Sequence, residues 1–314
     1  MATHSSDHWA LVLGGSSGFG LATAQRLAQH GMNVCIVHRD RRAALKGVEP
    51  EFEKIRGSGV QLLTFNKDAL DSEKRTEVLD ELATALGSDG RVRVLLHSIA
   101  FGNLKLIAPE RKPSGAAVEA LAGKLGVTPE KLREAADAVF EEGGDAAHTL
   151  AAPPEYSDKY YLAEDDFLRT IHSMGTSLLG WVQELHGRGH FAEDARVFGL
   201  TSEGNTVAWK GYAAVAAAKV ALESLSRSIA VEFAPYGVRC NVIQAGITET
   251  PALAAIPGSA HLKAQARLRN PFGRLTTPAD VANVIELLSR DEASWINGEV
   301  IRVDGGEHIS GVNG

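Results

Sequence analysis

The sequence contains few of the residues that mark specialised classes of protein. Among its 314 residues are only two cysteines, Cys35 and Cys240, each inside an apolar stretch. Two isolated thiols give neither a disulfide framework nor a cysteine-rich metal site, so we expect buried, reduced thiols and no metal. Aromatic residues make up 6% of the chain, but the hydrophobic fraction of 44% is enough for a large globular core.

Two further shortages argue against two classes of partner. The formal net charge is -7 and the sequence has no dense basic patch, so nucleic acid is not an expected partner. No apolar run reaches the roughly 18 residues of a membrane-spanning helix. The opening residues MATHSSDHW also lack the apolar core of a signal peptide. We therefore expect a soluble, cytoplasmic protein that does not bind membranes.

The sequence is rich in apolar strand-like segments that alternate with helical segments. The predicted strands cover residues 9–13, 33–38, 60–65, 92–99, 196–202, 238–245 and 299–303. The predicted helices cover residues 19–30, 71–86, 164–186, 212–234 and 278–290. The strands are continuous runs rich in Val, Ile and Leu, which is typical of parallel strands covered on both faces. The sequence therefore predicts one α/β domain over residues 1–314, with a doubly wound parallel (Rossmann-type) sheet of about seven strands.

One long segment, residues 103–165, interrupts this alternation. Its centre predicts two short helices, at about 115–125 and 129–142, separated by Gly126 and with Thr128 as the cap of the second. A structureless connection of this length is uncommon in a compact domain. We therefore predict a helical insertion after the fourth strand.

A glycine-rich loop joins the first predicted strand to the first predicted helix. Residues 13–20 read LGGSSGFG. The glycines permit a tight turn, close approach of the backbone to a diphosphate, and close helix–strand packing. The two serine hydroxyls lie beside a helix N-terminus, where anions bind favourably. We predict that the loop binds a dinucleotide through Gly14, Ser16, Ser17, Gly18, Phe19 and Gly20. A purely structural glycine turn is the alternative.

The end of the second predicted strand distinguishes the two nicotinamide dinucleotides. A carboxylate there accepts a hydrogen bond from a ribose 2′-hydroxyl, whereas an arginine accommodates a 2′-phosphate. Here the strand continues as VHRDRRA, in which Asp40 is the only carboxylate. Arg39 is our candidate for a bidentate phosphate contact, so the sequence favours NADPH over NADH. Solvated surface arginines are the alternative interpretation.

The segment from Ser202 to Lys219 carries the candidate catalytic groups. Tyr212 and Lys219 are seven residues apart in an alanine-rich, helix-forming stretch. Seven residues span about two helical turns, so the two side chains would point roughly the same way if both positions are helical. A phenol beside an ammonium can act as a proton donor that the positive charge supports. Alternatively, the two groups can be a structural pair. Ser202 offers either a second polar contact or a strand-end hydroxyl.

These motifs resemble the short-chain dehydrogenase/reductase superfamily, from residue 9 to about 310 and outside the insertion. Ordinary members have Tyr-x3-Lys, whereas this sequence has Tyr-x6-Lys. That spacing, with HSIAFG at residues 97–102, is similar to the enoyl-[acyl-carrier-protein] reductases. The glycine loop and Ser202 resemble their NADPH-dependent branch. VDGG at 303–306 resembles the C-terminal signature of the superfamily.

The resemblance implies roles for further residues. Asp68 and its neighbour Ala69 would hold the adenine, and Lys219 would hold the nicotinamide ribose. Tyr212 would donate a hydrogen bond to a thioester carbonyl oxygen. The remaining cofactor contacts would come from Ser98, Ile99 and Ala100 of HSIAFG, and from Gly246, Thr248 and Thr250 of AGITET.

The activity implied by the resemblance is NADPH-dependent reduction of the carbon–carbon double bond of a 2-enoyl thioester. The acyl group would be carried on CoA or acyl carrier protein, in fatty-acid or polyketide metabolism, and the enzyme would be a homotetramer. The insertion, longer than in usual members, would be a lid over the acyl chain or a contact for the carrier protein.

Two other functions stay open at this point. The dehydrogenase-like glycine loop fits carbonyl reduction or alcohol oxidation, although Tyr-x3-Lys is missing. A cofactor-binding module that docks a partner without chemistry is the second alternative. We expect His97 to be a structural hydrogen-bonding group rather than a catalytic one. Tyr156, Tyr160 and Tyr161 are expected either to line the pocket or to pack against other residues.

Overall fold

The fold is built on one sheet of seven parallel strands in the order β3-β2-β1-β4-β5-β6-β7. The strands are β1 (His8–Leu13), β2 (Asn33–His38), β3 (Leu62–Asn66), β4 (Arg91–His97), β5 (Phe191–Ser202), β6 (Val238–Ala245) and β7 (Val300–Val303). The computed structural model describes residues 3–111, 115–157 and 159–311. After β3 the chain returns to the other side of β1, so the sheet is doubly wound, as the sequence predicted.

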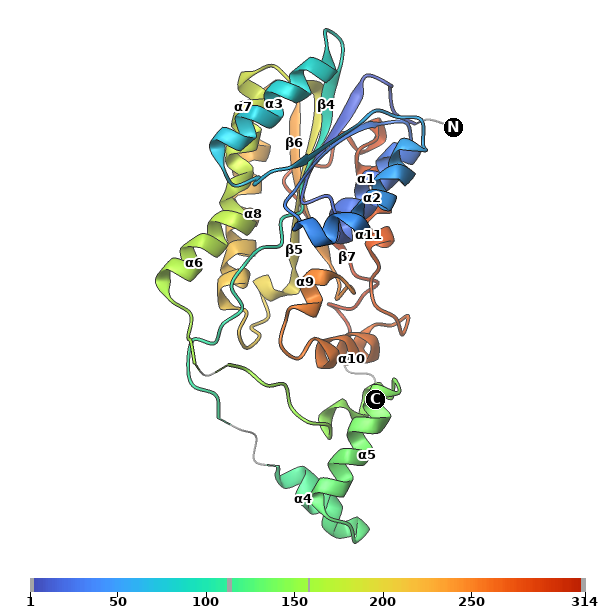
Figure 1. The fold of residues 1–314 in the computed structure, drawn as a ribbon, viewed down its shortest axis with the longest axis vertical. Coiled ribbons are helices and arrows are strands. Elements are labelled where there is room, and N and C mark those ends of the chain that lie inside the picture. The colour runs from blue at the N-terminus through green and yellow to red at the C-terminus, as the bar shows by residue number, and fades with distance from the viewer. Residues whose placement is uncertain (1–2, 112–114, 158, 312–314) are drawn as a thin grey trace.

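Helices cover both faces of this sheet (Figure 1). One face is covered by α1 (Gly18–Gln29), α2 (Arg42–Arg56) and α11 (Pro278–Leu288), and the other by α3 (Ser72–Leu86), α7 (Ser177–Gly187) and α8 (Ala213–Glu232). Successive side chains of β1 point to opposite faces of the sheet. Leu11 packs towards α3, α7 and α8, whereas Val12 packs towards α1, α2 and α11. Nearly every position of the inner strands β1, β2, β4 and β6 is therefore buried, which explains the continuous apolar runs, whereas the edge strands β3 and β7 are partly exposed.

Helix α2 was missed by the sequence analysis. It contains Gly47 and Pro50 in its interior, and both weaken a helical pattern. Its buried residues Val48, Phe52 and Ile55 recur at helical spacing and pack on the sheet. Tertiary packing of this apolar stripe therefore outweighs the poor local propensity.

The predicted helix 164–186 is divided in the structure. Its first part is α6 (Glu164–Ile171), its second part is α7, and a π-helical turn (His172–Thr176) joins them. Gly175 lies in this turn, and a β-carbon there would come within 2.8 Å of the carbonyl oxygen of Ala218 in α8. The turn thus lets α8 approach closely, and π-helical turns occur frequently at functional sites.

The helical insertion predicted after the fourth strand is present. Its helices are α4 (Ala116–Leu125) and α5 (Pro129–Glu141), and a 3₁₀ turn, Asp145–Thr149, follows them. Gly126 adopts the left-handed conformation between the helices, and the Thr128 hydroxyl accepts a hydrogen bond from the Lys131 amide. Residues 112–114 and 158 of the predicted range lie outside the described part of the chain.

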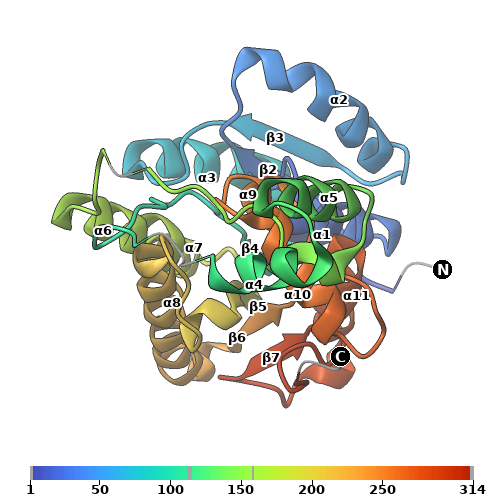
Figure 2. The same ribbon diagram turned by 90° about the horizontal axis from the view of Figure 1, so that it is seen from below.

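The insertion lies beyond the carboxyl edge of the sheet, next to two short helices that were not predicted. These are α9 (Pro251–Ala254) and α10 (Ser259–Arg269), and they follow β6. Figures 1 and 2 show α4 and α5 at this end of the molecule, away from the layers that cover the sheet. In the described ranges no helix is both long and apolar enough to cross a membrane.

The two cysteines are free and buried in the strands of the core, Cys35 in β2 and Cys240 in β6. Burial raises the pKa of the Cys240 thiol to about 12. Both side chains therefore behave as small apolar core residues.

Candidate active site

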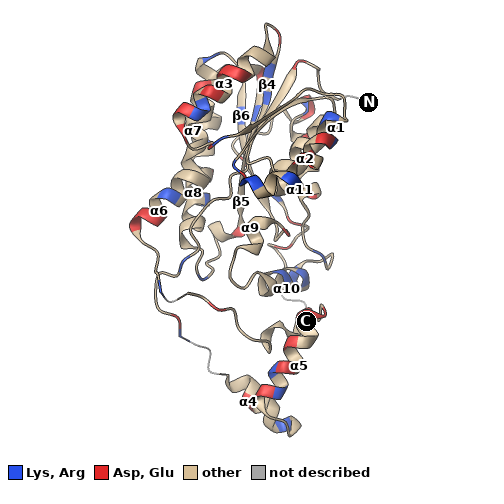
Figure 3. Ribbon diagram, viewed as in Figure 1, with Lys and Arg blue, Asp and Glu red and all other residues tan. Residues whose placement is uncertain are grey.

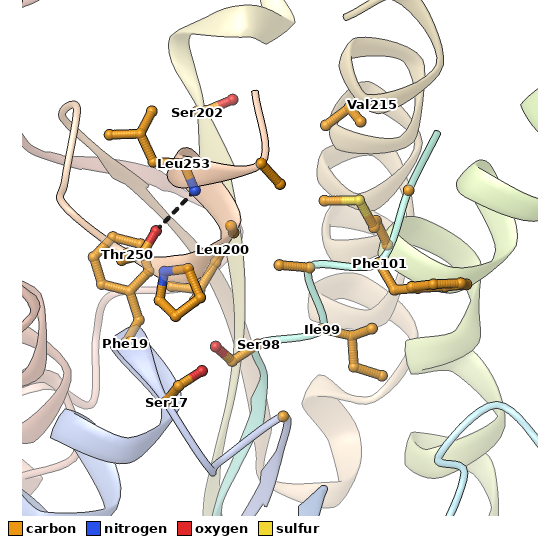
Figure 4. A pocket seen from close by; sticks show the side chains of 18 of the residues that line it. Ser17, Phe19, Ser98, Ile99, Phe101, Leu200, Ser202, Val215, Thr250 and Leu253 are labelled. Carbon is orange, nitrogen blue, oxygen red and sulfur yellow. Dashed lines mark hydrogen bonds between the residues drawn. The ribbon is translucent and has the colours of Figure 1, made fainter. Parts of the chain in front are cut away.

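A pocket of about 530 Å³ opens at the carboxyl edge of the sheet. Figure 4 shows its walls, with Ser17 and Phe19 on the α1 side and Ser98, Ile99 and Phe101 across from them. The predicted site residues that line it are Gly14, Ser16, Ser17, Gly18, Phe19, Arg39, Asp68, Ala69, Ser98, Ile99, Ala100, Ser202, Tyr212, Lys219, Gly246, Thr248 and Thr250. Gly20 is the exception. The carboxyl ends of parallel strands meet at one edge, which is why such distant segments converge here.

The glycine loop fits a bound diphosphate. Helix α1 begins at Gly18, the Ser17 side chain makes no capping hydrogen bond, and the first turn contains no acidic residue. The first backbone N–H groups of the helix are therefore available to an anion at the positive end of the helix dipole. Gly14 has a φ of 85°, and a β-carbon there would come within 2.6 Å of the Ser98 carbonyl oxygen. Gly14 thus lets the loop pack against the segment after β4, and the available N–H groups of α1 are what fits the diphosphate of a dinucleotide.

Gly20 lies behind the loop rather than in the pocket. A β-carbon at this position would stand 2.2 Å from the carbonyl oxygen of Gly14. Gly20 therefore allows the first turn of α1 to pack directly on the loop, which is the helix-packing role expected of the last glycine of the motif.

At the far end of the pocket, Arg39 bridges two other walls. Its Nη1 donates to Oδ2 of Asp68 at 2.6 Å, and its guanidinium lies 4.6 Å from the centre of the Phe101 ring. Asp40, the only carboxylate in the VHRDRRA segment, pairs instead with the Nδ1 of His38 at 2.7 Å. The Ala69 carbonyl accepts a hydrogen bond from the Trp181 indole, which fixes this wall to α7.

Tyr212 and Lys219 reach the pocket from the start of α8. Tyr212 is the N-cap residue and lies just outside the helix, which corrects the predicted start at 212, whereas Lys219 lies two turns inside. The Tyr212 hydroxyl is 3.3 Å from Oγ of Ser202. The Lys219 ammonium donates to the carbonyl oxygen of Leu200 at 2.8 Å. Both side chains line the same pocket, although only one of the two positions is helical.

Burial changes the titration of this pair. It raises the pKa of the Tyr212 phenol, with the Ser202 hydrogen bond acting in the opposite direction. It lowers the pKa of Lys219 to about 8, opposed by the charge of Glu223. At neutral pH the phenol is therefore protonated and able to donate a hydrogen bond, and the lysine is mostly charged.

The wall beside Tyr212 is apolar. Met174, Tyr212, Val215 and Ala218 form a buried cluster, against which Trp209 and other apolar side chains pack. The sequence analysis did not select Trp209 or Phe101 as site residues. Their positions in the sequence could have indicated them as site residues, because Trp209 stands three residues before Tyr212 and Phe101 belongs to HSIAFG. Val215 occupies the place one helical turn before Lys219, and it also lines the pocket.

The loop after β6 forms the remaining wall. The hydroxyl of Thr250 accepts the Leu253 amide at 3.2 Å and so caps α9 (Figure 4). The hydroxyl of Thr248 donates to the carbonyl oxygen of Gly246 at 2.9 Å. A β-carbon on Gly246 would lie 2.7 Å from a carboxylate oxygen of Glu307. The backbone of this loop is therefore packed tightly from behind.

A partly buried charge cluster at the wall of the pocket was also missed, and one of its members, Glu203, lines the cavity. One Nη2 atom of Arg269 donates to Glu203 at 2.6 Å and to Glu307 at 2.9 Å. Glu203 directly follows Ser202, and Glu307 also accepts the backbone amide of Ile247. Arg269, at the end of α10, thus joins the segment after β5 to the loop after β6.

His97 is a structural group, as expected. It is fully buried, its Nε2 lies 2.8 Å from the Ser177 hydroxyl, and burial lowers its pKa to about 3. The tyrosines of the insertion do not line the pocket. Tyr156 packs against Gly211, and Tyr160 and Tyr161 are exposed, so the pocket-lining alternative for them is wrong.

Two family models and several known proteins are similar to this chain. Residues 8–109 match the family model "short chain dehydrogenase", and residues 128–308 match the model "Enoyl-(Acyl carrier protein) reductase". Over 96% of both chains, the protein is 26% identical to a cis-4-hydroxycyclohexanecarboxylate dehydrogenase of Sinomonas cyclohexanicum. It is 27% identical, again over 96% of both chains, to a probable 2,4-dienoyl-CoA reductase of Bacillus subtilis.

A third relative is the NADH-dependent enoyl-[acyl-carrier-protein] reductase of Aquifex aeolicus. It is 42% identical over 103 residues, which is 33% of this chain and 38% of the relative. The crystal structure of that relative superposes on the present structure with a TM-score of 0.68. The match covers 97% of this chain and 98% of the relative. With more than half of its length matched by one family model and much of the remainder by the other, the chain belongs to the short-chain dehydrogenase/reductase superfamily of NAD(P)-binding oxidoreductases.

Proposed function

We propose that the protein reduces the carbon–carbon double bond of a 2-enoyl thioester with NADPH. The observation that carries this proposal is the position of Tyr212 relative to Lys219. In a Tyr-x3-Lys arrangement the phenol would come from position 215, which is occupied here by Val215. The phenol comes from Tyr212 instead, three residues earlier, which is about 4.5 Å along a helix axis. The hydrogen-bond donor is therefore displaced by nearly one turn, away from the lysine.

Such a displacement suits conjugate reduction. In carbonyl reduction, the oxygen that needs a donor is about 1.2 Å from the carbon that receives hydride. In an enoyl thioester, hydride adds to the β-carbon, and the carbonyl oxygen lies three bonds away, at roughly 3 Å. The donor must therefore stand farther from the hydride source.

The residues of the chain have separate tasks in this reaction. Bound NADPH supplies the hydride. Negative charge then develops on the thioester oxygen, where the buried, protonated Tyr212 donates a hydrogen bond, before the α-carbon takes a proton from solvent. One such donor typically contributes about 2.7–4 kcal/mol. Lys219 adds positive potential from two turns inside α8 and would hold ribose hydroxyls, and Ser202 orients the phenol from 3.3 Å.

The pocket walls support an acyl substrate. Leu104, Met174, Trp209, Val215 and Ile256 give an apolar surface beside the Tyr212 hydroxyl. A hydrocarbon chain buried there gains roughly 0.8 kcal/mol for each methylene. We propose a thioester carried by CoA or acyl carrier protein as the substrate.

The choice of NADPH rests on the end of β2. Asp40 is held by His38, so the carboxylate that would receive a ribose 2′-hydroxyl already has a partner. The side chain of Arg39 is half exposed and lines the pocket. A 2′-phosphate would replace Asp68 as its partner, in a charge-assisted contact.

The test is turnover of purified protein with NADPH and a series of 2-enoyl thioesters, from crotonyl-CoA to longer acyl chains on carrier protein. Oxidation of NADPH, followed at 340 nm, is expected. Tyr212→Phe should reduce kcat by about 10²–10³-fold and leave the Kd for NADPH unchanged. Tight NADPH binding without turnover at any chain length would reject the proposal.

Carbonyl reduction or alcohol oxidation is the second candidate. It is favoured by the Ser202–Tyr212 contact and by the full-length similarity to a hydroxycyclohexanecarboxylate dehydrogenase. Turnover of cyclic ketones and alcohols separates the two reactions. A kcat/KM higher for 4-oxocyclohexanecarboxylate than for every enoyl thioester would favour this candidate.

A further inference from the structure

The insertion does not form the wall of the pocket. Among its described residues, only Leu104, at its first turn away from β4, lines the cavity. After Leu104, the insertion contacts two segments that line the pocket. One is the loop of Trp209 and Tyr212, and the other is the α9–α10 region.

The first set of contacts fixes the loop that carries Tyr212. The Lys210 ammonium donates to Glu110 of the insertion at 2.7 Å. The next residue, Gly211, has a φ of 72°, and a β-carbon there would meet the Tyr156 ring at 3.5 Å. Burial raises the pKa of Tyr156. Both arms of the insertion, before α4 and after α5, thus contact the two residues that directly precede Tyr212.

The second set of contacts fixes α10. The Arg267 guanidinium forms a two-pronged ion pair with Asp145, with Nε 2.6 Å from Oδ2. The His261 ring lies edge-on to Phe140, with the ring centres 5.0 Å apart. Both side chains of the ion pair are partly buried, at 34% exposure for Arg267 and 16% for Asp145. Figure 3 shows Lys and Arg positions along α10, which lies at the end of the molecule where the insertion lies.

Helix α10 is in turn connected to the site. Arg269, two residues after Arg267, bridges Glu307 and the pocket-lining Glu203. At its other end, α10 follows Ile256, which lines the substrate side. Gly258 lies between them, and a β-carbon there would lie 2.6 Å from Pro154 of the insertion. A shift of α10 caused by the insertion would therefore move two walls of the pocket, the one with Glu203 and the one with Ile256.

From these contacts we propose that the insertion is a brace. It holds the Tyr212 loop and α10 at a fixed separation, and Asp145 is its positioning residue, acting through Arg267. The brace sets the width of the pocket at the acyl end without contributing to dinucleotide binding. Its effect on turnover rests on the proposed enoyl-thioester function, whereas its effect on mobility does not.

Charge reversal tests the brace in the full-length protein. Asp145→Arg and Arg267→Asp are made singly and together, with Lys54→Glu, which breaks a surface pair on α2, as the matched control. Hydrogen exchange is measured over residues 205–212 and 251–269. Each single variant should lose about tenfold protection in both segments, and the double variant should recover most of it, because coupled pairs are not additive.

Steady-state kinetics give the second measurement. The single variants should raise the KM for the enoyl thioester by about tenfold, an estimate based on coupling of 0.5–3 kcal/mol between contacting residues. The Kd for NADPH should stay the same. Asp145→Asn keeps the size of the side chain and removes only its charge, so it controls for misfolding caused by charge reversal. This variant should also raise the KM for the enoyl thioester.

Unchanged exchange in both segments in the single variants and in Asp145→Asn would overturn the brace. Altered exchange that the double variant does not restore would also overturn it. If exchange responds as expected but no enoyl thioester is turned over even by the unmodified protein, the brace stands and the proposed function fails.

The root of the insertion permits a further variant. The Leu162 amide donates to the Leu106 carbonyl at 2.9 Å, so the two ends of the insertion lie side by side. Replacing residues 107–161 by Asn-Gly, a two-residue turn, should preserve NADPH binding and loosen the 205–212 and 251–269 segments. Loss of NADPH binding in a folded variant would contradict the proposal.

Discussion

At the scale of single residues, the site depends on how burial divides the roles of Tyr212 and Lys219. Both side chains are buried, and in each case burial favours the neutral form. For the phenol this keeps the proton with which it donates a hydrogen bond. For the ammonium it brings the pKa to about 8, within reach of physiological pH.

This titration predicts a pH dependence. Because the pKa of Lys219 in the folded protein is about 8, its charged fraction falls as the pH rises through that value. The kcat/KM for the dinucleotide, which reports groups of the free enzyme, should therefore decline above about pH 8. Lys219→Arg should move this decline to higher pH, since arginine stays protonated. A pH profile of kcat/KM that is unchanged by this substitution would show that Lys219 is not the titrating group.

Arg39 allows a prediction about cofactor preference. Its guanidinium is the group we assign to the 2′-phosphate, and a hydrogen bond to a charged group contributes about 1.5–3 kcal/mol. Arg39→Ala should weaken NADPH binding by about 10–100-fold, as expected from a loss of that size. Calorimetry with NADPH and NADH measures the change. Equal loss for both dinucleotides would mean that Arg39 supports the pocket through Asp68 and Phe101 rather than through the phosphate.

At the scale of elements, the turn from β1 into α1 leaves no room for a side chain at Gly20. Gly20→Ala would place a methyl group 2.2 Å from the Gly14 carbonyl oxygen and must displace the loop from α1. We expect dinucleotide binding to weaken by at least tenfold, with the remaining fold retained. Gly47→Ala is the control, because this exposed position in α2 has nothing within 4 Å. That control should raise the free energy of unfolding by about 0.5–1 kcal/mol and leave binding unchanged.

At the scale of the whole molecule, the assembly is a proposal with a clear measurement. Val220 and Val231 on α8 and Leu168 on α6 are exposed apolar residues on the face away from the sheet. For a homotetramer formed through this face, light scattering should give about four times the chain mass of 33.4 kDa. Val231→Lys should lower that mass, whereas Val139→Lys, at an exposed apolar position of α5 in the insertion, should not. A monomer at micromolar concentration would reject the tetramer.

Much of the fold could be predicted because the relevant signals are local. The seven strands are apolar runs, and α11 begins at Pro278, where the predicted helix 278–290 begins. Strand ends differ by a few residues; β5, for example, begins at Phe191 rather than at 196. Helix α2, the π-helical turn and α10 were missed, because their stability or shape depends on contacts with distant segments.

The sequence by itself determined the doubly wound sheet, the glycine loop and the spacing of Tyr212 from Lys219, since periodicity and short motifs encode these features. Only the tertiary structure decided how those groups meet and titrate. Burial, which sets the pKa values of both side chains, is a property of the packed molecule. The bridge of Arg269 between Glu203 and Glu307, and the pair of Asp145 with Arg267, join residues 38 to 122 positions apart. No local pattern specifies such partners, because they become neighbours only when the chain has folded.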